Sequence, residues 1–583
     1  MPDSANQWAD DLLGRMDLNQ KIGQLLVFGF CGPVVTPDVV ELIDKYHVGG
    51  LRVSLKFRSM NLFHDVKPGT TPADWTLRSL HLPAGLNRDF AFMSPCTHCT
   101  ARQYARTLNR LRDIALDRPG SIPIHFTIDQ EGSGSDDLLC GQKLFPHPMG
   151  ITASGDEQLA YDVAFAVGTQ ARGVGINMVH SPVLDVNTNP ANPEIGTRAY
   201  SDNSDDVTRF ALRALEGFDA AGVIATGKHF PGRGESVADA HWQLPTVDLD
   251  LGELNDVHLA PYRKLIPAGL PAIMMAHSLY PALGAPDTPA SCSTKIVREY
   301  LRGELGFDGV ITTDNMMMGG LLQKYELCEA TLRALQAGCD LVLLRDESPV
   351  RIKIVETLVE AAKSGELPES QIDESVLRIL KMRRRMGLTD NGGKVNLSQA
   401  EQSVRNPDIA SKATDAAQRS ILLLRDQAKA LPLDPSCEIL LVEQVFPTHE
   451  MVNDMDCHPG LLWDEMCSLS PNVGSVEIRN IPTDDDMQRV LRRAAQAEIV
   501  VATNYYYHKA ASSNTAIIRK LIEAGKRVVV ITNTPYEFGA PDEADTVIVV
   551  FNPGSREHLR AAARVVYGSL TPISKLPVRL TSG

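Results

Sequence analysis

Between residues 20 and 385, short hydrophobic runs alternate with longer amphipathic stretches. The runs are rich in β-branched residues, and the stretches between them have the apolar spacing of helices. This alternation is typical of repeated βα units, whose strands form a parallel sheet. The runs expected to be strands are residues 25–30 (LLVFGF), 49–55 (GGLRVSL), 123–129 (PIHFTID), 176–182 (INMVHSP), 222–230 (GVIATGKHF), 272–278 (AIMMAHS), 309–314 (GVITTD) and 339–344 (CDLVLL).

The stretches at residues 204–222 and 293–306 carry helix signals at both ends. Each opens on residues that favour an N-cap, keeps apolar residues three or four positions apart and closes on glycine. Eight strands alternating with such helices predict an α/β fold, a (β/α)8 TIM barrel. Residues 57–100 lack clear periodicity and are interpreted as an insertion into the barrel.

A polar segment at residues 389–407 follows the barrel pattern. It contains Gly-Gly and Asn-Pro, shows no apolar face, and is interpreted as a linker. Hydrophobic runs resume beyond it, at residues 438–443 (EILLVE), 499–504 (IVVATN), 527–533 (RVVVITN) and 546–552 (TVIVVFN). The predicted organisation is a barrel catalytic domain at 1–388 and a smaller α/β sandwich domain at 408–583.

Length and charge narrow the class of protein. At 583 residues the chain is too long for a single hydrophobic core. The formal net charge of -15 argues against nucleic acid and anionic membrane as main partners. No apolar run reaches the roughly 18 residues that a membrane span requires. The first residues lack a basic segment followed by an apolar core, so no secretory signal is expected and a cytoplasmic location is favoured.

Cysteine and histidine spacing argues against a metal or disulfide framework. The 10 cysteines have no regular spacing, which favours reduced thiols. Cys96 and Cys99 flank His98 in a CTHC motif, but no second ligand pair at zinc-finger spacing follows. The 15 histidines are dispersed and none shows the His-x-x-x-His spacing of a helical metal site. Neither a metal nor an organic cofactor is expected.

Several predicted strands end on ionisable residues. In a barrel of this class the chemistry lies at the C-terminal ends of the strands, so these residues are informative. They are Asp129, His180, Asp185, Lys228, His229, His277 and Asp314. A single strand-end aspartate more often caps the next helix. Five strands that converge on one rim nevertheless predict a polar site there, in which His180, His277 and Asp185 are interpreted as supporting contacts.

The loop after the fifth strand, KHFPGRGESVADAHWQLP at residues 228–245, concentrates ionisable groups. Its Pro-Gly-Arg-Gly turn suits a loop that closes over a substrate. Asp239 and His241 lie two residues apart, so in an extended backbone both side chains project from one side. The carboxylate would then orient the imidazole and favour its charged form, as a general acid and base requires. The alternative is that the pair only pins the loop by hydrogen bonds.

These motifs resemble glycoside hydrolase family 3, in particular the two-domain form of its β-N-acetylglucosaminidase branch. That branch has a Lys-His-Phe-Pro-Gly-His-Gly-Asp stretch followed by Asp-Ser-His. The segments that carry the resemblance are KHFPGRGE (228–235), DAH (239–241), NPANPEIGTRAYS (189–201), DQEG (129–132), DGVITTDNMM (308–317), AAQRSILLLRD (416–426) and PISKLPV (572–578). They occur in the family's order and cover nearly the whole chain.

The resemblance implies a retaining exo-β-N-acetylglucosaminidase that removes terminal N-acetyl-β-D-hexosamine through a covalent glycosyl-enzyme intermediate. It implies Asp314 as the nucleophile and His241 as the acid/base, with Asp239 as its orienting partner. These groups supply the carboxylate and the proton donor that a retaining glycosidase needs. The residues implied to bind the sugar are Asp129, Arg198, Lys228 and His229.

The implied partner is a carbohydrate with a terminal N-acetylglucosamine. Three roles stay open for the second domain: covering the site, mediating a homodimer and stabilising the barrel. The family's Gly-Gly-Arg-Val after Asp-Gln-Glu-Gly is replaced here by EGSGSDDLLCG, which puts Asp136 and Asp137 where basic residues are expected near the outer sugar hydroxyls. Arg233 and Glu235 replace the family's His and Asp, and are interpreted as a weak ion pair on an exposed loop.

Two other functions stay open. A histidine acid/base presents no fixed negative charge to an incoming anion, so inorganic phosphate in place of water would make the protein a β-N-acetylglucosaminide phosphorylase. Arg233 is then a candidate phosphate ligand, although a solvated surface arginine is the favoured interpretation. The second alternative is a non-catalytic sugar-binding protein on the same scaffold. Retention of all three implied catalytic residues argues against it.

Overall fold

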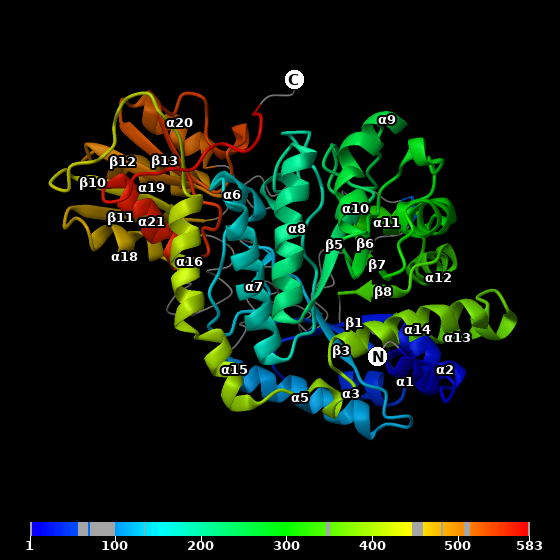
Figure 1. Ribbon diagram of the computed structural model, residues 1–583. Helices are drawn as coiled ribbons and strands as arrows, with labels where there is room; N and C mark the ends of the chain where they lie inside the picture. The colour runs from blue at the N-terminus through cyan, green and yellow to red at the C-terminus, as the bar shows by residue number, and fades with distance from the viewer. Residues whose placement is uncertain are drawn as a thin grey trace.

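The fold consists of a closed eight-stranded barrel followed by a six-stranded sheet (Figure 1). It is seen in a computed structural model that describes residues 3–55, 68–69, 99–132, 135–345, 350–445, 459–479, 482–506 and 514–580. The expected fold class, a TIM barrel followed by a smaller α/β unit, is confirmed. Almost all of the predicted insertion at about 57–100, with Cys96 and His98, lies outside the described residues.

All eight predicted barrel strands form, and each pairs in parallel with its sequence neighbours until the last returns to the first. They are β1 (Leu26–Cys31), β2 (Gly50–Ser54), β3 (His125–Ile128), β4 (Met178–Val179), β5 (Ile224–Phe230), β6 (Ala272–Met275), β7 (Val310–Asn315) and β8 (Leu341–Leu344). Strands covered on both faces read as continuous apolar runs, as these do. At the end of β7, Asp314 and Asn315 are only partly buried, so this strand opens toward a site.

Helices surround the barrel on its outside (Figure 1). They are α1 (Asp3–Leu13), α2 (Leu18–Gln24), α3 (Pro37–Asp44), α5 (Ala101–Asp117), α6 (Pro148–Ala153), α7 (Glu157–Val174), α8 (Ser204–Ala221), α9 (Leu251–Glu253), η4 (Leu254–His258), α10 (Ala260–Leu265), η7 (Lys295–Glu304), α11 (Gly319–Leu322), α12 (Leu327–Ala337), α13 (Val350–Ser364) and α14 (Glu369–Arg385). Short 3₁₀ turns form at η3 (Gly196–Arg198), η5 (Pro281–Leu283) and η6 (Ala290–Cys292).

Both helices that the sequence signals predicted are present, with local differences. Helix α8 is capped by the Asn203 side chain, which accepts from the backbone N–H of Asp205 and Asp206, and it ends where Gly222 adopts a positive φ of 75°. The predicted helix at 293–306 forms as η7, a π-helix, in which the N–H groups donate five residues back. The hydrophobic period alone does not distinguish these two kinds of helix.

The segment predicted to be a linker, residues 389–407, contains regular structure. After the turn η8 (Asn391–Gly393), helix α15 (Leu397–Val404) packs against α5 and α7. Its Ala400 and Val404 are buried, so the expectation of a segment without an apolar face is wrong. Two apolar residues four positions apart were too few to give a sequence signal. The boundaries at 388 and 408 remain a prediction.

The second sheet has the strand order β11-β10-β12-β13-β14-β9, parallel except for the antiparallel β9. Its strands are β9 (Leu422–Asp426), β10 (Ile439–Gln444), β11 (Val473–Ile478), β12 (Ile499–Asn504), β13 (Arg527–Thr532) and β14 (Thr546–Val549). The remaining elements are α16 (Pro407–Ser420), α18 (Leu461–Cys467), α19 (Asp484–Ala494), α20 (Thr515–Glu523), η9 (Glu537–Gly539) and α21 (Arg556–Val566). The sequence predicted the four inner strands and missed β9 and β11, the two edge strands, which are only partly buried.

A small hydrophobic core joins the barrel side to the sheet. Met149 and Ala153 of α6 pack with Val549 and Phe551 at the end of β14. The approach is close at Gly150, where an added Cβ would lie 2.6 Å from the Phe551 Cβ atom. The His147 N–H also donates to the Phe551 carbonyl at 3.1 Å. The sheet is thereby fixed beside α6, as Figure 1 shows.

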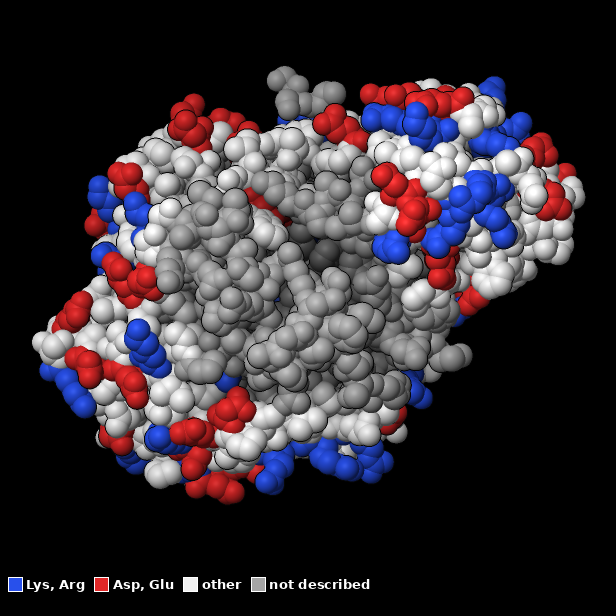
Figure 2. Space-filling model, turned by 180° about the vertical axis from the view of Figure 1, so that it is seen from behind, with Lys and Arg blue, Asp and Glu red and all other residues white. Residues whose placement is uncertain are grey.

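The described surface carries mixed charge. On the described parts of the face in Figure 2, acidic and basic side chains are interspersed, as the scattered charges of the sequence predict. Within the described ranges, no helix combines the length and the apolar character that crossing a membrane demands.

Replacing Phe551 by alanine tests whether the small core holds the sheet on the barrel. Because Phe551 is fully buried, Phe551→Ala is expected to lower the free energy of unfolding by about 3–5 kcal/mol. Urea denaturation followed by tryptophan fluorescence measures the loss. Ile573→Ala, at a side chain that is 66% exposed, is the control and should change stability by less than about 0.5 kcal/mol. Equal effects of the two substitutions would contradict the assignment of this core.

Candidate active site

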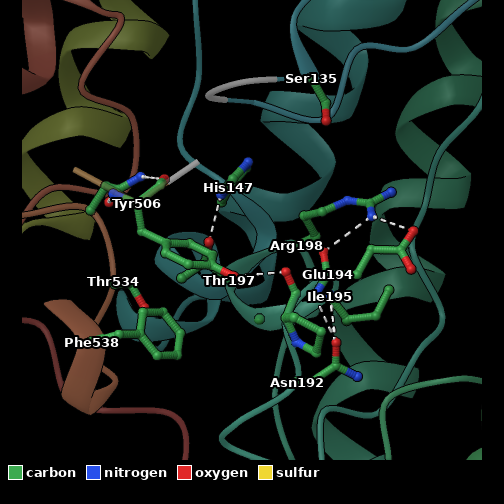
Figure 3. A pocket seen from close by; sticks show the side chains of 13 residues that line it. Ser135, His147, Asn192, Glu194, Ile195, Thr197, Arg198, Tyr506, Thr534 and Phe538 are labelled. Atoms are coloured by element: carbon green, nitrogen blue, oxygen red, sulfur yellow. Dashed lines mark hydrogen bonds and ion pairs between the residues drawn. The ribbon is translucent and has the colours of Figure 1, made fainter. Parts of the chain in front are cut away.

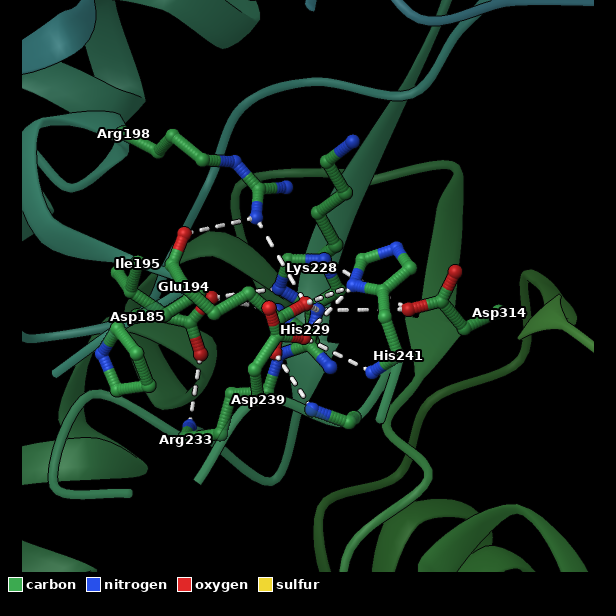
Figure 4. A network of polar contacts seen from close by, with 12 residues as sticks. Asp185, Glu194, Ile195, Arg198, Lys228, His229, Arg233, Asp239, His241 and Asp314 are labelled. Atoms are coloured by element: carbon green, nitrogen blue, oxygen red, sulfur yellow. Dashed lines mark hydrogen bonds and ion pairs between the residues drawn. The ribbon is translucent and has the colours of Figure 1, made fainter. Parts of the chain in front are cut away.

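Ionisable side chains from several strands meet at one end of the barrel (Figure 4). The group combines residues that follow β3, β4 and β5, two residues within β5, and one of the last residues of β7. Its members are Asp129, Glu131, Asp185, Glu194, Arg198, Lys228, His229, Arg233, Asp239, His241 and Asp314. The convergence predicted from the strand ends therefore occurs.

Asp129, which directly follows β3, lies among three cationic or ring donors. Its carboxylate contacts the Arg52 Nη2 atom at 2.6 Å, the Lys228 Nζ atom at 3.1 Å and the His180 Nδ1 atom at 3.2 Å. Burial alone opposes ionisation of this carboxyl, but the charges of Lys228 and Arg52 outweigh burial and hold its pKa well below the usual range. The side chain remains 24% exposed and carries a negative charge at the bottom of the site.

Glu131 joins two residues that the sequence predicted, Arg198 and Lys228. The Arg198 guanidinium donates to both of its oxygens, with Nε at 2.8 Å and Nη2 at 3.1 Å, and Lys228 forms a second ion pair with it. Burial opposes ionisation, yet these two cations lower the pKa of Glu131 to about 2. Sequence reasoning did not single out Glu131, although it stands within the DQEG motif.

Lys228 and His229 are consecutive, yet both contact carboxylates of the site. The β5–β6 register shifts between Lys228 and Phe230, an irregularity that changes the alternation of side chains. The His229 Nδ1 atom lies 2.6 Å from Asp185, and its Nε2 atom lies 3.9 Å from Asp314. Burial, together with the nearby cations, holds the pKa of His229 well below its usual range. Burial also raises the pKa of Asp185 to about 6.

The predicted pair Asp239 and His241 is present. The His241 Nδ1 atom lies 2.8 Å from Asp239 Oδ1, and the ring is 31% exposed. Burial opposes the charged form, but Asp239, Glu194 and Asp314 outweigh it and raise the pKa of His241. The backbone here is a turn and not the extended chain that was assumed, because the N–H groups of Trp242 and Gln243 both donate to the Asp239 carbonyl.

Arg233 departs most from the sequence interpretation. An exposed ion pair with Glu235 was expected, but the Arg233 side chain is 2% exposed and contacts Glu194 at 2.7 Å and Asp314 at 3.4 Å. The expectation is wrong because the loop packs tightly on the chain after β4. At Gly234 an added Cβ would lie 1.7 Å from the Val186 carbonyl oxygen, so only glycine fits and the neighbouring arginine turns inward.

Arg233 also determines the charge state of Asp314. Burial opposes ionisation of Asp314, but the charge of Arg233, with smaller effects of His277 and His241, outweighs burial and lowers the pKa of Asp314. His277 itself contacts the Ser291 hydroxyl at 2.8 Å, which agrees with a supporting position. The carboxylate of Asp314 is 15% exposed and faces the site from the end of β7 (Figure 4).

Arg52 of β2 is a further site residue that sequence reasoning missed. Besides Asp129, it forms an ion pair with Asp137, one of the two aspartates found where basic residues were expected. Asp136 accepts from the Gly132 N–H at 3.0 Å and from the Asn552 side chain at 3.2 Å. A lone arginine inside the buried run GGLRVSL was an available signal for Arg52. A cation thus reaches this part of the site from β2 instead of from the loop after β3.

The second sheet contributes side chains beside the site. Tyr506 donates its hydroxyl to the Pro193 carbonyl at 2.8 Å, and its ring lies against Phe538 with centroids 4.4 Å apart. These rings, with Arg198 and Glu194 on the barrel side, line a cavity of about 50 Å³ (Figure 3). The position of the second sheet is therefore consistent with one of the three roles left open for the second domain, which is to cover the site.

One group of residues in the described part of the chain has the types and proximity of metal ligands. Possible ligand atoms of Glu194, Asp239 and His241 lie within 4.8 Å of one another. Contacts within the protein account for this proximity, because Asp239 bonds the His241 ring and Arg233 neutralises Glu194. We interpret the group as a hydrogen-bonded set of acids and a base.

Comparisons with known proteins agree on one family. A model of the Glycosyl hydrolase family 3 N terminal domain matches residues 90–382, about half of the chain. Beta-hexosaminidase A from Pseudoalteromonas piscicida is 32% identical over 354 residues, which are 56% of this chain and 58% of that protein. A beta-N-acetylglucosaminidase/beta-glucosidase from Cellulomonas fimi is 27% identical over 57% of this chain and 59% of its own length. The chain thus spans less than two thirds of the length of these two relatives.

A solved structure resembles the whole chain. The glycoside hydrolase family 3 beta-N-acetylglucosaminidase from Paenibacillus sp. str. FPU-7 superimposes with a TM-score of 0.83 at 29% sequence identity. The match covers 97% of this chain and 100% of that one, so both the barrel and the second sheet are included.

Glu131→Gln tests the buried ion pairs at the bottom of the site. The substitution leaves Arg198 and Lys228 without their shared carboxylate, and should reduce the free energy of unfolding at pH 7 by about 3–5 kcal/mol. The pKa of Glu131 in the folded protein is about 2, below the usual 4.5. The wild type therefore loses the stability that the ionised Glu131 contributes as pH falls from 4.5 to 2. The difference in unfolding free energy between wild type and variant should narrow over this range. Urea denaturation across this range measures it, with the exposed Glu253→Gln as the control. A difference that does not change with pH would contradict the assignment.

Proposed function

This chain belongs to glycosyl hydrolase family 3, and from that membership we propose that it is a retaining exo-β-N-acetylglucosaminidase. The proposal rests on one observation: an aspartate whose pKa is lowered and a histidine whose pKa is raised, Asp314 and His241, face one polar site. A retaining glycosidase needs a carboxylate that attacks the anomeric carbon and a proton donor at the leaving oxygen. The names of the relatives support an N-acetylhexosaminide as the substrate.

In the first step, an Asp314 oxygen attacks the anomeric carbon while the bond to the leaving oxygen breaks. The Nδ1 side of the His241 ring faces Asp239, so Nε2 is the atom that donates a proton to the leaving oxygen. Asp239 keeps the ring in position and stabilises the imidazolium before transfer. The products of this step are a glycosyl ester on Asp314, a neutral His241 and the free leaving group.

In the second step, the neutral His241 accepts a proton from a water molecule at Nε2. The water oxygen attacks the anomeric carbon from the side that the leaving group vacated, and the bond to Asp314 breaks. The carboxylate and the imidazolium are both restored, and two inversions give net retention.

The terminal sugar is proposed to bind against Asp129, Arg198, Lys228 and His229. Asp129 and Arg198 keep the larger exposed fractions, 24% and 12%, and are assigned direct contacts with hydroxyls. Lys228 and His229 are 2% exposed and line the floor of this subsite. Charged donors and acceptors suit sugar hydroxyls because hydrogen bonds to ionised groups are the stronger ones.

Phosphorolysis is the second candidate, and its support is the histidine acid/base. The neutral His241 of the second step leaves no negative charge on that group to repel phosphate. Arg233 no longer supports this candidate, because it is buried and paired with Glu194 and Asp314. Product analysis distinguishes the two reactions, since phosphorolysis yields a sugar 1-phosphate.

Asp314→Ala and His241→Ala test the catalytic assignments with 4-nitrophenyl N-acetyl-β-D-glucosaminide. Asp314→Ala should reduce kcat/KM by at least about 10⁴-fold because no intermediate forms. His241→Ala should reduce it by about 10²–10⁴-fold, and less with a 2,4-dinitrophenyl leaving group, which needs no proton. Nitrophenol release measures both, and Asp308→Ala, an exposed aspartate before β7, is the control.

Each assay is repeated with inorganic phosphate. Hydrolysis that is indifferent to phosphate supports the proposal. Strong stimulation with a sugar 1-phosphate product would replace it by the phosphorylase, and a folded wild type that binds N-acetylglucosamine without turnover would replace it by the sugar-binding protein.

The pH dependence of kcat/KM should have a broad plateau. Activity requires ionised Asp314, whose pKa lies below the usual 3.8, and protonated His241, whose pKa lies above the usual 6.5. Activity should therefore be lost on the acid side only below pH 3.8 and on the basic side only above pH 6.5, within the range where the protein stays folded. In His241→Ala the basic limb should disappear. A wild-type basic limb centred below pH 6.5 would contradict the assignment of His241.

A further inference from the structure

Arg233 contacts the proposed nucleophile, Asp314, and a second carboxylate, Glu194. Its Nη2 atom lies 3.4 Å from the Asp314 carboxylate and 2.7 Å from the Glu194 carboxylate (Figure 4). The side chain is 2% exposed, so its charge is screened little by solvent. One guanidinium is therefore shared between the nucleophile and a second carboxylate.

Glu194 in turn contacts the proposed acid/base. Its Oε1 atom lies 3.4 Å from His241 Nδ1, the atom that Asp239 holds at 2.8 Å. Its other oxygen accepts from the Ala240 N–H at 3.2 Å, which joins it to the backbone between Asp239 and His241. The imidazole thus faces two carboxylates, one from its own turn and one from the chain after β4.

The backbone around Arg233 fixes this arrangement. The Arg233 N–H donates to Asp185 at 2.8 Å, and the Asn192 side chain donates to the Arg233 carbonyl at 2.9 Å. The Asn192 carbonyl oxygen of the side chain also accepts from the Glu194 N–H at 3.0 Å. Asn192 therefore holds the backbones of Arg233 and Glu194 in register, and neither residue leaves its partner without breaking these bonds.

On the basis of the proposed function, we propose that Glu194 and Arg233 are positioning residues that couple the nucleophile to the acid/base. Arg233 keeps the Asp314 carboxylate ionised for attack. Glu194 acts beside Asp239 as a second carboxylate that keeps the His241 imidazole protonated for donation. Each residue also satisfies the other, because a buried carboxylate without a cation is costly.

The charges around the two catalytic groups agree with this role. His241 is faced by Asp239 from its own turn, Glu194 from the chain after β4 and Asp314 from β7, and these three raise its pKa against burial. Asp314 is faced by Arg233 and His241 from the loop after β5, by His229 from β5 and by His277 after β6. Among these neighbours of Asp314, Arg233 has the printed ion pair at 3.4 Å and keeps its positive charge when His241 gives up its proton.

The pair also suits the charge changes of the reaction. Glycosylation neutralises Asp314 and His241 together, so the sum of their charges stays at zero. Glu194 and Arg233 likewise sum to zero before and after the step. Glu194 and Arg233 therefore stay paired with each other while the charge of His241, which Asp239 also faces, changes.

The first test is Glu194→Gln. Removing its negative charge destabilises the imidazolium, so the basic limb of the kcat/KM profile should move to lower pH by about one unit. The titration of His241, followed by NMR in histidine-labelled protein and assigned with His241→Asn, should shift by the same amount. Glu235→Gln is the matched control, because Glu235 is in the same loop and accepts from Thr188 without touching the catalytic groups.

The second test is Arg233→Met, with Arg233→Lys as the conservative variant. Loss of the cation should move the acid limb to higher pH by about one unit, and lysine should restore most of it. Arg233→Met leaves Glu194 with only the longer contact to Arg198, at 3.9 Å. The double variant Glu194→Gln/Arg233→Met should therefore fold more stably than Arg233→Met alone.

The outcomes separate this inference from the proposed function. If Glu194→Gln leaves both the His241 titration and the basic limb unchanged, Glu194 has only a structural role and the inference fails. If the wild type does not cleave N-acetylhexosaminides, the proposed function fails, while the NMR titration still decides whether Glu194 and His241 are coupled. Should Glu194→Gln not fold, the His241 titration of the double variant is compared with that of Arg233→Met, because these two proteins differ only by the Glu194 carboxylate.

Discussion

The requirement that buried charge be paired governs this site. Many charged side chains at this end of the barrel are buried, and a buried ionised group is stable only beside an opposite charge. Glu131 accordingly has Arg198 and Lys228, and Glu194 has Arg233, whereas Asp185 faces the His229 ring and burial raises its pKa to about 6. The cations come from loops and strands far apart in sequence, so pairing also fixes how these segments lie against one another.

The same requirement shifts the pKa values of the two proposed catalytic groups in opposite directions. Asp314 lies beside a cation and its pKa falls, whereas His241 lies between carboxylates and its pKa rises. Opposite pKa shifts of two titratable groups in one site suit two different roles, here the proposed nucleophile and the proposed acid/base. Arg233 and Glu194 lie between the two environments, because Arg233 contacts Asp314 and Glu194 contacts His241.

The second sheet acts on the site through a few defined contacts. Tyr506 binds the Pro193 carbonyl, one residue before Glu194, and Tyr536 accepts from the Asn187 side chain at 2.8 Å. The core around Phe551 holds the sheet where these contacts form. The segment that carries Glu194 and Arg198 is therefore supported from the barrel on one side and from the sheet on the other.

The sequence by itself determined the barrel strands, the inner strands of the second sheet and most of the site. Hydrophobic runs reveal buried strands because burial on both faces excludes polar residues, and strand ends place Asp129, Lys228 and Asp314 on one rim. Local spacing likewise brought Asp239 next to His241, although a turn and not an extended chain achieves it.

Only the tertiary structure decided which charges pair. The sequence favours a surface position for Arg233 because nothing local shows that Gly234 packs on the Val186 carbonyl and turns the arginine inward. Arg52 pairs with Asp129, 77 residues away, and Glu131 pairs with Arg198, 67 residues away. Glu194 gains its role from Arg233 and His241, which lie on the loop after β5. The partially buried edge strands β9 and β11 and the helix α15 lack a strong pattern for a related reason. Pairing and edge burial depend on distances through space, which hydrophobic periodicity along the chain does not encode.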